Sequence, residues 1–152
     1  MHVRTVLGPK LTLSFLLITT ALANIVQTVD CAGWSMRVDE YSQGQSELCS
    51  RYGAPFLPVE LYSKLGAAPN IKGDLKPLNG LRHPPQSGTN GWYLWCGPDF
   101  PVGNDAFLPL HTRHVKGWNS LALKYLGLPP GWRFLTDGKY EDVWFDETLL
   151  DI

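Results

Sequence analysis

Three histidines are the side chains whose type and spacing come closest to those of a metal site. His111 and His114 are three residues apart, which places them on one face of a helix, and His83 could complete a three-histidine zinc site. Such a site would make the protein a secreted metal-dependent hydrolase. The chain has no His-Glu-x-x-His or paired Cys-x-x-Cys motif, and Pro109 leaves His111 at a poorly defined helix start. We therefore expect hydrogen-bonded or surface histidines with no metal and no cofactor, and keep the hydrolase as the alternative.

Adjacent carboxylates are the second feature with catalytic potential. They occur as Glu141-Asp142 and Asp146-Glu147, but neighbouring residues of a strand point to opposite faces, so Glu141 and Asp142 cannot share a site there. No serine lies in a Gly-x-Ser-x-Gly elbow, no glycine motif suits a phosphate, and Cys96 has no recognisable histidine context. The sequence predicts no catalytic residue, and we do not expect an enzyme.

The charge distribution bears on the kind of partner. A formal net charge of −1 without any run of Lys or Arg argues against nucleic acid, which needs a concentrated basic surface. From residue 137 to residue 152 acidic side chains far outnumber the single Lys139. Two interpretations stay open, namely a solvated surface that aids solubility and an electrostatic match for a basic partner.

Trp144 stands in the middle of this acidic segment. Strand alternation places Asp142, Trp144 and Asp146 on one face, and Val143 with Phe145 on the other, where we expect the core. A tryptophan flanked by acids is typical of a binding hot spot, although the two leucines that follow could equally cover it. The predicted partner-binding residues are Glu141, Asp142, Trp144, Asp146, Arg82 and His83.

Helices and strands that would position these residues follow from periodicity and breakers. An apolar stripe predicts a helix over residues 39–52, and the Pro- and Gly-rich stretch 56–91 excludes long helices. Within that stretch we expect one short strand around 72–78 and an extended or loop segment at 81–85. The wholly apolar and aromatic run 92–96 predicts a central strand.

The C-terminal third predicts a helix and a hairpin. The helix is expected over 111–126, divided at Gly117, recapped by Asn119 or Ser120, and ended by a left-handed Gly127. Strands at 131–136 and 140–145, joined by an Asp-Gly turn, predict an antiparallel hairpin.

These elements predict an α+β fold: one small domain in which a short, mostly antiparallel sheet with the hairpin 131–145 packs against two or three helices. The expected core residues are Trp92, Leu94, Trp95, Trp118, Leu126, Trp132, Phe134, Val143 and Phe145.

The N-terminus has the pattern of a secretory signal. Residues 1–23 combine a basic start, an apolar stretch and an Ala-Leu-Ala ending, which slightly favours export to the periplasm, followed by a linker at 24–38 and the domain at 39–152. The apolar stretch is too short for a stable span of a hydrocarbon core of about 30 Å. The alternative is translation from Met36 and a cytoplasmic protein, which the odd set of Cys31, Cys49 and Cys96 mildly supports.

Several motifs carry a resemblance to a known family. The stretches 80–85, 91–95, 124–135 and 140–146 resemble those of the immunity protein 33-like family of small bacterial proteins, over about residues 47–152. The resemblance implies a single α+β domain that binds and neutralises a cognate toxin, and it carries no catalytic meaning. Family members usually lack a leader, so the N-terminus departs from the pattern. A structural or ligand-binding module without a toxin stays open, and the sequence leaves the oligomeric state undetermined.

Overall fold

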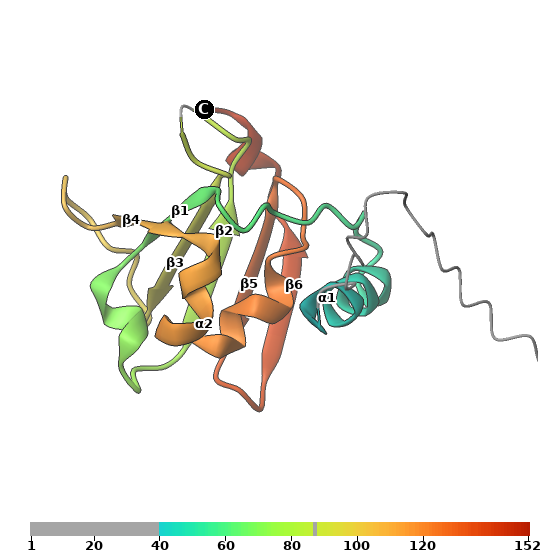
Figure 1. Cartoon of the computed structure of the whole chain (residues 1–152), viewed down its shortest axis with the longest axis horizontal. Helices are drawn as coiled ribbons and strands as arrows, with labels where there is room; N and C mark the ends of the chain where they lie inside the picture. Colours follow the sequence, from blue (N-terminus) through green and yellow to red (C-terminus); the bar gives the residue numbers. More distant parts are fainter. Residues whose placement is uncertain (1–39, 87) are drawn as a thin grey trace, which may run out of the picture. The chain divides into compact units, whose positions relative to one another are not determined.

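A mixed six-stranded sheet forms the frame of the computed structural model, which describes residues 40–86 and 88–152 (Figure 1). The strands are β1 (Lys64–Ala67), β2 (Leu78–Arg82), β3 (Trp92–Cys96), β4 (Leu108–His111), β5 (Trp132–Thr136) and β6 (Glu141–Phe145). Their spatial order is β4-β1-β3-β2-β5-β6. The β1–β3 pair is parallel, and the other four neighbouring pairs are antiparallel. The predicted α+β class with a mostly antiparallel sheet is confirmed.

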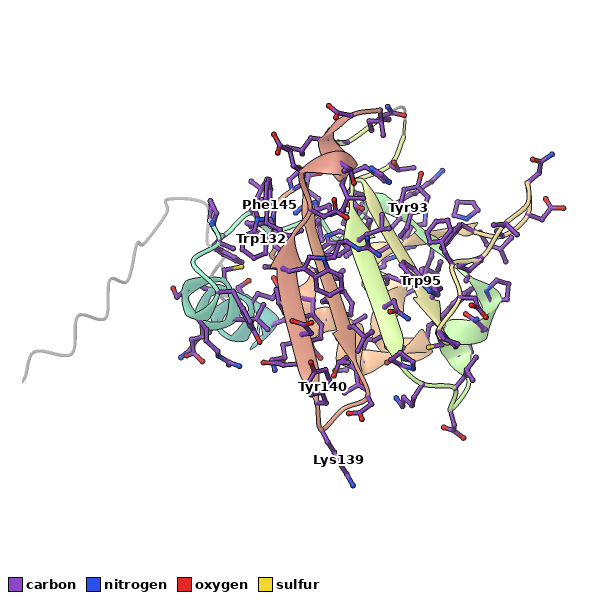
Figure 2. The ribbon with its side chains drawn as sticks, turned by 180° about the vertical axis from the view of Figure 1, so that it is seen from behind. Tyr93, Trp95, Trp132, Lys139, Tyr140 and Phe145 are labelled. Atoms are coloured by element: carbon purple, nitrogen blue, oxygen red, sulfur yellow. The ribbon has the colours of Figure 1, made fainter. Side chains whose placement is uncertain are left out.

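Helices cover one face of this sheet. The α-helices are α1 (Glu40–Arg51) and α2 (Val115–Trp118). The 3-10 segments are η1 (Pro69–Lys72), η2 (Thr112–His114), η3 (Ser120–Tyr125) and η4 (Glu147–Leu150), of which η4 packs on the other side of the sheet. In Figure 1, α2 lies in front of the sheet and α1 lies beside β6. Residues of both helices pack into the main core, and we call the side of the sheet that they cover the helical face. The opposite side, which we call the open face, is turned toward the viewer in Figure 2 and has no α-helix over it in the part of the chain described.

The main core lies between the sheet and the helical layer. Trp92 and Phe134 are its largest fully buried side chains, and the Tyr125 ring stacks on Phe134 with the ring centroids 4.0 Å apart. A smaller cluster on the open face joins Leu81 and Trp95 to Leu149 of η4. The strands β2 and β3 are therefore covered on both faces, as the uniformly apolar sequence of β3 predicted.

The C-terminal hairpin has the predicted form. Strands β5 and β6 pair from Trp132 opposite Phe145 to Thr136 opposite Glu141. In the turn, the Asp137 carboxylate accepts hydrogen bonds from the backbone N–H groups of Lys139 (2.8 Å) and Tyr140 (2.7 Å). This turn chemistry fixes the register, and with it the face on which each side chain of β6 lies.

The strand prediction was incomplete outside β3 and the C-terminal hairpin. The strand expected around 72–78 is instead β2, which begins at Leu78, and β1 and β4 were not predicted. The sequence pattern of β1 and β2 is weak partly because they contain Gly66 and Gly80, which leave space for aromatic rings of neighbouring strands. A Cβ atom at Gly66 would collide with Tyr93, and one at Gly80 with Phe134. Tertiary packing thus outweighs the low strand propensity of glycine.

The helix expected over 111–126 with a division at Gly117 was wrong in its start and in the position of its division, because Gly117 lies inside α2 and the break comes at Asn119. The segment breaks into η2, α2 and η3, while His111 ends β4. The predicted recapping at Asn119 is confirmed, because its side chain accepts a hydrogen bond from the Leu121 N–H (3.2 Å). Gly127 does not adopt the expected left-handed conformation. Glycine is required there for space, since a Cβ atom would meet the Phe56 ring at 2.6 Å.

Several N-terminal predictions lie outside the described residues: the signal segment 1–23, the linker 24–38, the alternative start at Met36, and Cys31. Across residues 40–86 and 88–152, none of the helices combines the length and the hydropathy that a membrane span requires. Cys49 and Cys96 are buried free thiols.

Candidate functional site

Strand β6 places its acidic and aromatic side chains as alternation predicts. Trp144 lies opposite Arg133 on the open face, whereas Val143 lies opposite the buried Phe134 on the helical face. Phe145 also points to the helical face, but it is 51% exposed, so its assignment to the core was wrong. The reason is that β6 is an edge strand, and Phe145 lies at its end, where Trp132 is its ring partner at 5.9 Å.

Arg133 contacts Trp144 and Asp146, two of the three β6-region residues that were predicted to share one face. Its guanidinium carbon lies 5.2 Å from the centroid of the Trp144 ring, and its Nη1 donates to Asp146 at 2.9 Å. Asp146 also caps η4 by accepting from the N–H of Thr148. The Thr148 hydroxyl and Arg133 together lower the pKa of Asp146 below its usual value. Trp144 is therefore half-buried against Arg133, while Leu149 packs into the cluster of Leu81 and Trp95.

Glu141 lies on the helical face and forms a hub between three elements. Its carboxylate accepts hydrogen bonds from Arg51 of α1 and from Lys124 and Tyr125 of η3. Burial alone would raise the pKa of Glu141, but the Lys124 and Tyr125 hydrogen bonds and the nearby cations outweigh it and lower the pKa. Asp142 is exposed and forms no ion pair with any described residue. Of the two adjacent acids, Asp142 is thus the one available to a partner.

Arg82 is not placed to meet a partner, although it was among the predicted contact residues. Its side chain is buried, with 3% of the residue exposed. The guanidinium donates to the carbonyl oxygens of Leu128 (2.6 Å), Leu57 (2.8 Å) and Asn90 (3.3 Å). Burial lowers the pKa of Arg82 to about 10. The Arg82 side chain thus hydrogen-bonds three connecting segments, at Leu57, Asn90 and Leu128, to the end of β2.

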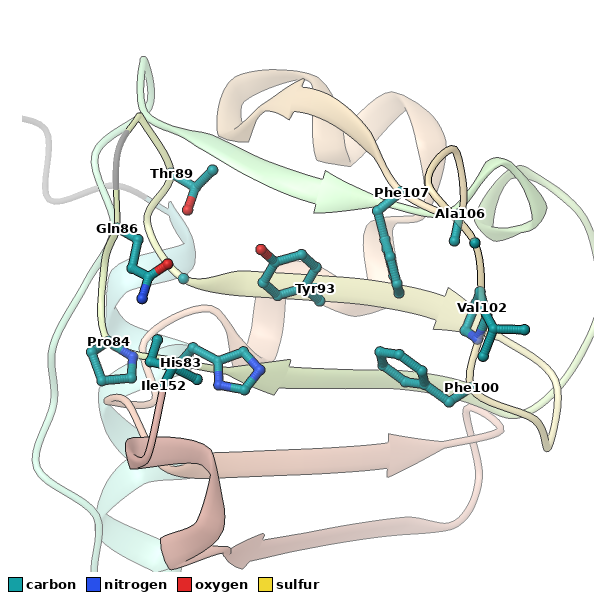
Figure 3. A pocket seen from close by; sticks show the side chains of 13 residues that line it. His83, Pro84, Gln86, Thr89, Tyr93, Phe100, Val102, Ala106, Phe107 and Ile152 are labelled. Atoms are coloured by element: carbon teal, nitrogen blue, oxygen red, sulfur yellow. The ribbon is translucent and has the colours of Figure 1, made fainter.

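His83 follows β2 directly and lines a pocket on the open face, shown in Figure 3. The pocket has a volume of about 470 Å³ and lies between the end of the β2–β3 pair and the loop 97–107. His83 Nδ1 is 2.8 Å from the carbonyl oxygen of Leu149. A carbonyl can only accept, so Nδ1 carries the proton and Nε2 of the neutral ring keeps a lone pair.

Aromatic side chains form the remaining walls of the pocket. Tyr93 comes from β3, and Phe100 and Phe107 come from the loop 97–107. Ring centroids are 5.2 Å apart between Tyr93 and Phe107, and 5.5 Å apart between Phe100 and Phe107. Phe100 also packs edge-on against Trp95, with their centroids 5.0 Å apart. Sequence reasoning missed this site because a loop supplies half of it. The available signal was the pair of phenylalanines bracketing a Pro- and Gly-rich loop.

The pocket and the β6 row lie on the same face of the sheet. Strand register aligns Gly66, Tyr93, Leu81, Arg133 and Trp144 in one line from β1 to β6. Tyr93, at the pocket, and Trp144 therefore have two strands, β2 and β5, between them. One partner spanning the open face would meet both.

The three histidines of the zinc hypothesis do not come together. His111 ends β4, whereas His83 follows β2, and the strands β1 and β3 lie between them. His111 Nδ1 is 2.9 Å from the Tyr62 carbonyl oxygen, and the His111 and His114 rings are 6.2 Å apart. In the described part of the chain, no group of three His, Cys, Asp or Glu residues is arranged to hold a metal ion.

The predicted core residues occupy a range of environments. Trp118 and Trp132 are half-buried at the margin of the main core. The buried members are Trp92, Leu94, Trp95, Leu126, Phe134 and Val143.

Comparison with known protein families identifies a match. The family model for the Imm33-like domain matches residues 44–146, about two thirds of the 152-residue chain. The matched region runs from α1 to Asp146 and contains all six strands. Searches of the curated proteins and of the solved structures give no match.

Proposed function

Because the chain belongs to the Imm33-like domain family, we propose that it is a non-enzymatic, immunity-type protein that binds and neutralises a cognate bacterial toxin. The observation that carries this proposal is the match over residues 44–146, which includes every strand of the sheet. An immunity protein of this kind acts by occupying a surface of the toxin, so its function depends on a binding face.

The open face at β6 is the binding face that the geometry favours. Trp144 is held against Arg133, so little side-chain entropy would be lost when a partner covers it. Asp142 lies on the same strand and is exposed. A pre-positioned tryptophan beside a carboxylate suits a partner that offers an apolar contact next to a basic side chain.

The surrounding charge supports a basic partner. Glu147 and Asp151, which follow β6, are exposed and form no ion pairs with other described residues. Glu141 and Asp146, by contrast, are already paired with Arg or Lys. Fewer carboxylates are therefore open to a toxin than the sequence suggests. On β6, the unpaired carboxylate is that of Asp142. Unpaired surface carboxylates speed association with a basic surface and lose this effect in salt.

Co-expression tests the proposal. The products of neighbouring genes are tested for toxicity, for rescue by this protein, and for co-purification with it. We expect one of them to be toxic, to be rescued and to bind. Replacing Trp144→Ala should weaken binding by about tenfold or more, the size of a hot-spot loss.

A matched control comes from the same hairpin. Tyr140 is another aromatic side chain, 59% exposed but located at the turn rather than on the open face. Tyr140→Ala should leave binding unchanged. Absence of any toxic neighbour, together with absence of rescue, would reject the immunity function. Equal losses in both variants would reject the β6 face as the contact.

A further inference from the structure

The pocket beside His83 has walls that suit an organic cation. Tyr93, Phe100, Phe107 and His83 surround it, and neighbouring rings meet edge to face or tilted at 5.2 to 5.7 Å. The faces of such rings carry negative electrostatic potential and attract ammonium or guanidinium groups. Phe100 is 49% exposed, so its ring is accessible to a group entering from outside.

One end of the pocket is rich in hydrogen-bond acceptors. Since Nδ1 of His83 donates to the Leu149 carbonyl, Nε2 is the nitrogen that carries the lone pair in the neutral form of the ring. Figure 3 shows the Tyr93 hydroxyl pointing toward the end of the pocket where Gln86 and Thr89 lie. The side chains of Tyr93, Gln86 and Thr89 make no hydrogen bond to any other residue that the structure describes. A donor-rich ligand would satisfy all of them.

The segments that supply the pocket's lining residues contain acidic side chains and no basic ones. No Lys or Arg occurs in residues 83–86, 88–93, 97–107 and 147–152, the segments from which the lining residues come. Asp99, Asp105 and Asp151 each directly precede a residue that lines the pocket. None of these three forms an ion pair with another described residue, so their charge is free to attract a cation.

We propose that this pocket binds an arginine side chain of a protein partner. The guanidinium group is planar, stacks on aromatic faces, is weakly hydrated and presents five N–H donors to the acceptors at the polar end. Lysine offers a compact, strongly hydrated charge and fits the aromatic walls less well. A volume of about 470 Å³ accommodates a long side chain. The identity of the partner rests on the proposed immunity function, since the same open face carries Trp144.

The test is an NMR titration of the full chain with capped amino acids. N-acetyl-arginine amide should shift the signals of Tyr93 and His83 saturably. N-acetyl-citrulline amide has the same shape without the charge, and it should bind at least about tenfold more weakly, with the lysine derivative between them. Equal binding of arginine and citrulline derivatives, or no saturable shift with arginine, would overturn the assignment.

Variants in one loop provide the matched control. Phe100→Leu should weaken arginine binding at least about fivefold, because it removes the aromatic face. Val102→Ala changes an aliphatic side chain of the same pocket that is 89% exposed, and should have no effect. Thr89→Val tests the polar end independently of the loop and should weaken binding. Unchanged binding in both Phe100→Leu and Thr89→Val would place the ligand elsewhere.

The rim charges are tested in the same way. The double variant Asp99→Asn and Asp105→Asn should weaken binding, and salt should weaken the wild type more than this variant. Asp74→Asn removes an exposed acid outside the pocket segments and serves as the control. Equal behaviour of the two variants would remove the electrostatic part of the proposal.

The outcomes separate this inference from the proposed function. Arginine binding at the pocket without any rescued toxin would reject the immunity function and assign the pocket to another arginine-bearing partner. Full toxin rescue by Phe100→Leu, with no arginine binding in the wild type, would reject the pocket and leave the immunity function standing.

Discussion

Replacing Arg82→Met should destabilise the domain strongly, although Arg82 has no carboxylate partner among the described residues. Two short hydrogen bonds, to Leu128 and Leu57, and a longer one to Asn90 are lost. Hydrogen bonds to a charged group contribute about 1.5–3 kcal/mol each, and the longer bond contributes less, which gives about 4–7 kcal/mol in total. Against this stands the cost of burying the cation.

The lowered pKa of Arg82 sets that cost. A fall from 12.5 to about 10 corresponds to about 3 kcal/mol at 1.36 kcal/mol for each pKa unit. The difference leaves a net loss of about 1–4 kcal/mol on substitution, with methionine filling most of the volume of the arginine stem. For a domain of this size the melting temperature should fall by roughly 10 °C.

The measurement is urea unfolding followed by tryptophan fluorescence, with Arg51→Met as the matched control. Arg51 is also paired, with Glu141, but its side chain is 57% exposed, so its loss should cost less than about 1 kcal/mol. A loss below about 1 kcal/mol for Arg82→Met would show that water or neighbouring groups satisfy the three carbonyls, and the reasoning would fail. Similar losses in the two variants would refute it equally.

Three further predictions concern single positions. The pKa of Glu141 is lowered in the folded state, so its ionised form stabilises the protein above the unfolded-state value of 4.5 and this contribution is lost as pH falls. Glu141→Gln should lower the stability by about 1 kcal/mol at pH 7. It should also make the decline in stability between roughly pH 5 and pH 3 less steep, as measured by thermal melts at each pH, and an unchanged slope would contradict this. Gly91→Ala should unfold the protein or cost more than about 3 kcal/mol, because φ is +88° and a Cβ atom would collide with the backbone of His83. Gly88→Ala is the control, since φ is +80° but the space around it is open, and it should cost only about 1–2 kcal/mol in the same urea assay. Gly44→Ala, inside α1 with nothing within 4 Å of the new methyl group, should stabilise by about 1 kcal/mol, and a loss of stability would mean that the helix needs glycine there.

Local sequence predicts the elements whose signals are local. The run 92–96 is a strand because every residue is apolar or aromatic, and the hairpin follows from an Asp-Gly turn between two such runs. The 3.6-residue stripe of α1 also survives in the structure despite Gly44. Each of these segments contains enough information to specify its own conformation.

Other features depend on contacts between distant segments. The strands β1 and β2 contain glycines whose reason is a ring on the neighbouring strand, and no pattern within four or five residues reveals that ring. Arg82 looks like a surface cation in the sequence, but two of its three carbonyl partners, Leu57 and Leu128, are 25 and 46 residues away in the chain. The pocket likewise exists only where the β2–β3 connection, the loop 97–107 and the C-terminal residue Ile152 come together. The alternation of β6 gave the faces of Asp142 and Trp144 but not the internal pairing of Asp146.

The glycine in β1 has a consequence for how the binding face can change. Gly66 leaves the space in which the Tyr93 ring rests, and Tyr93 also contacts Phe107. The side chain at position 66 therefore sets the height of the pocket floor, although residue 66 does not line the pocket. An alanine or serine there would push the ring outward and shrink the space available to a ligand. In related sequences, the size of residue 66 and the shape of the accepted partner group should vary together. Substitution at position 66 is therefore a way to alter the specificity of the pocket without changing any residue that lines it.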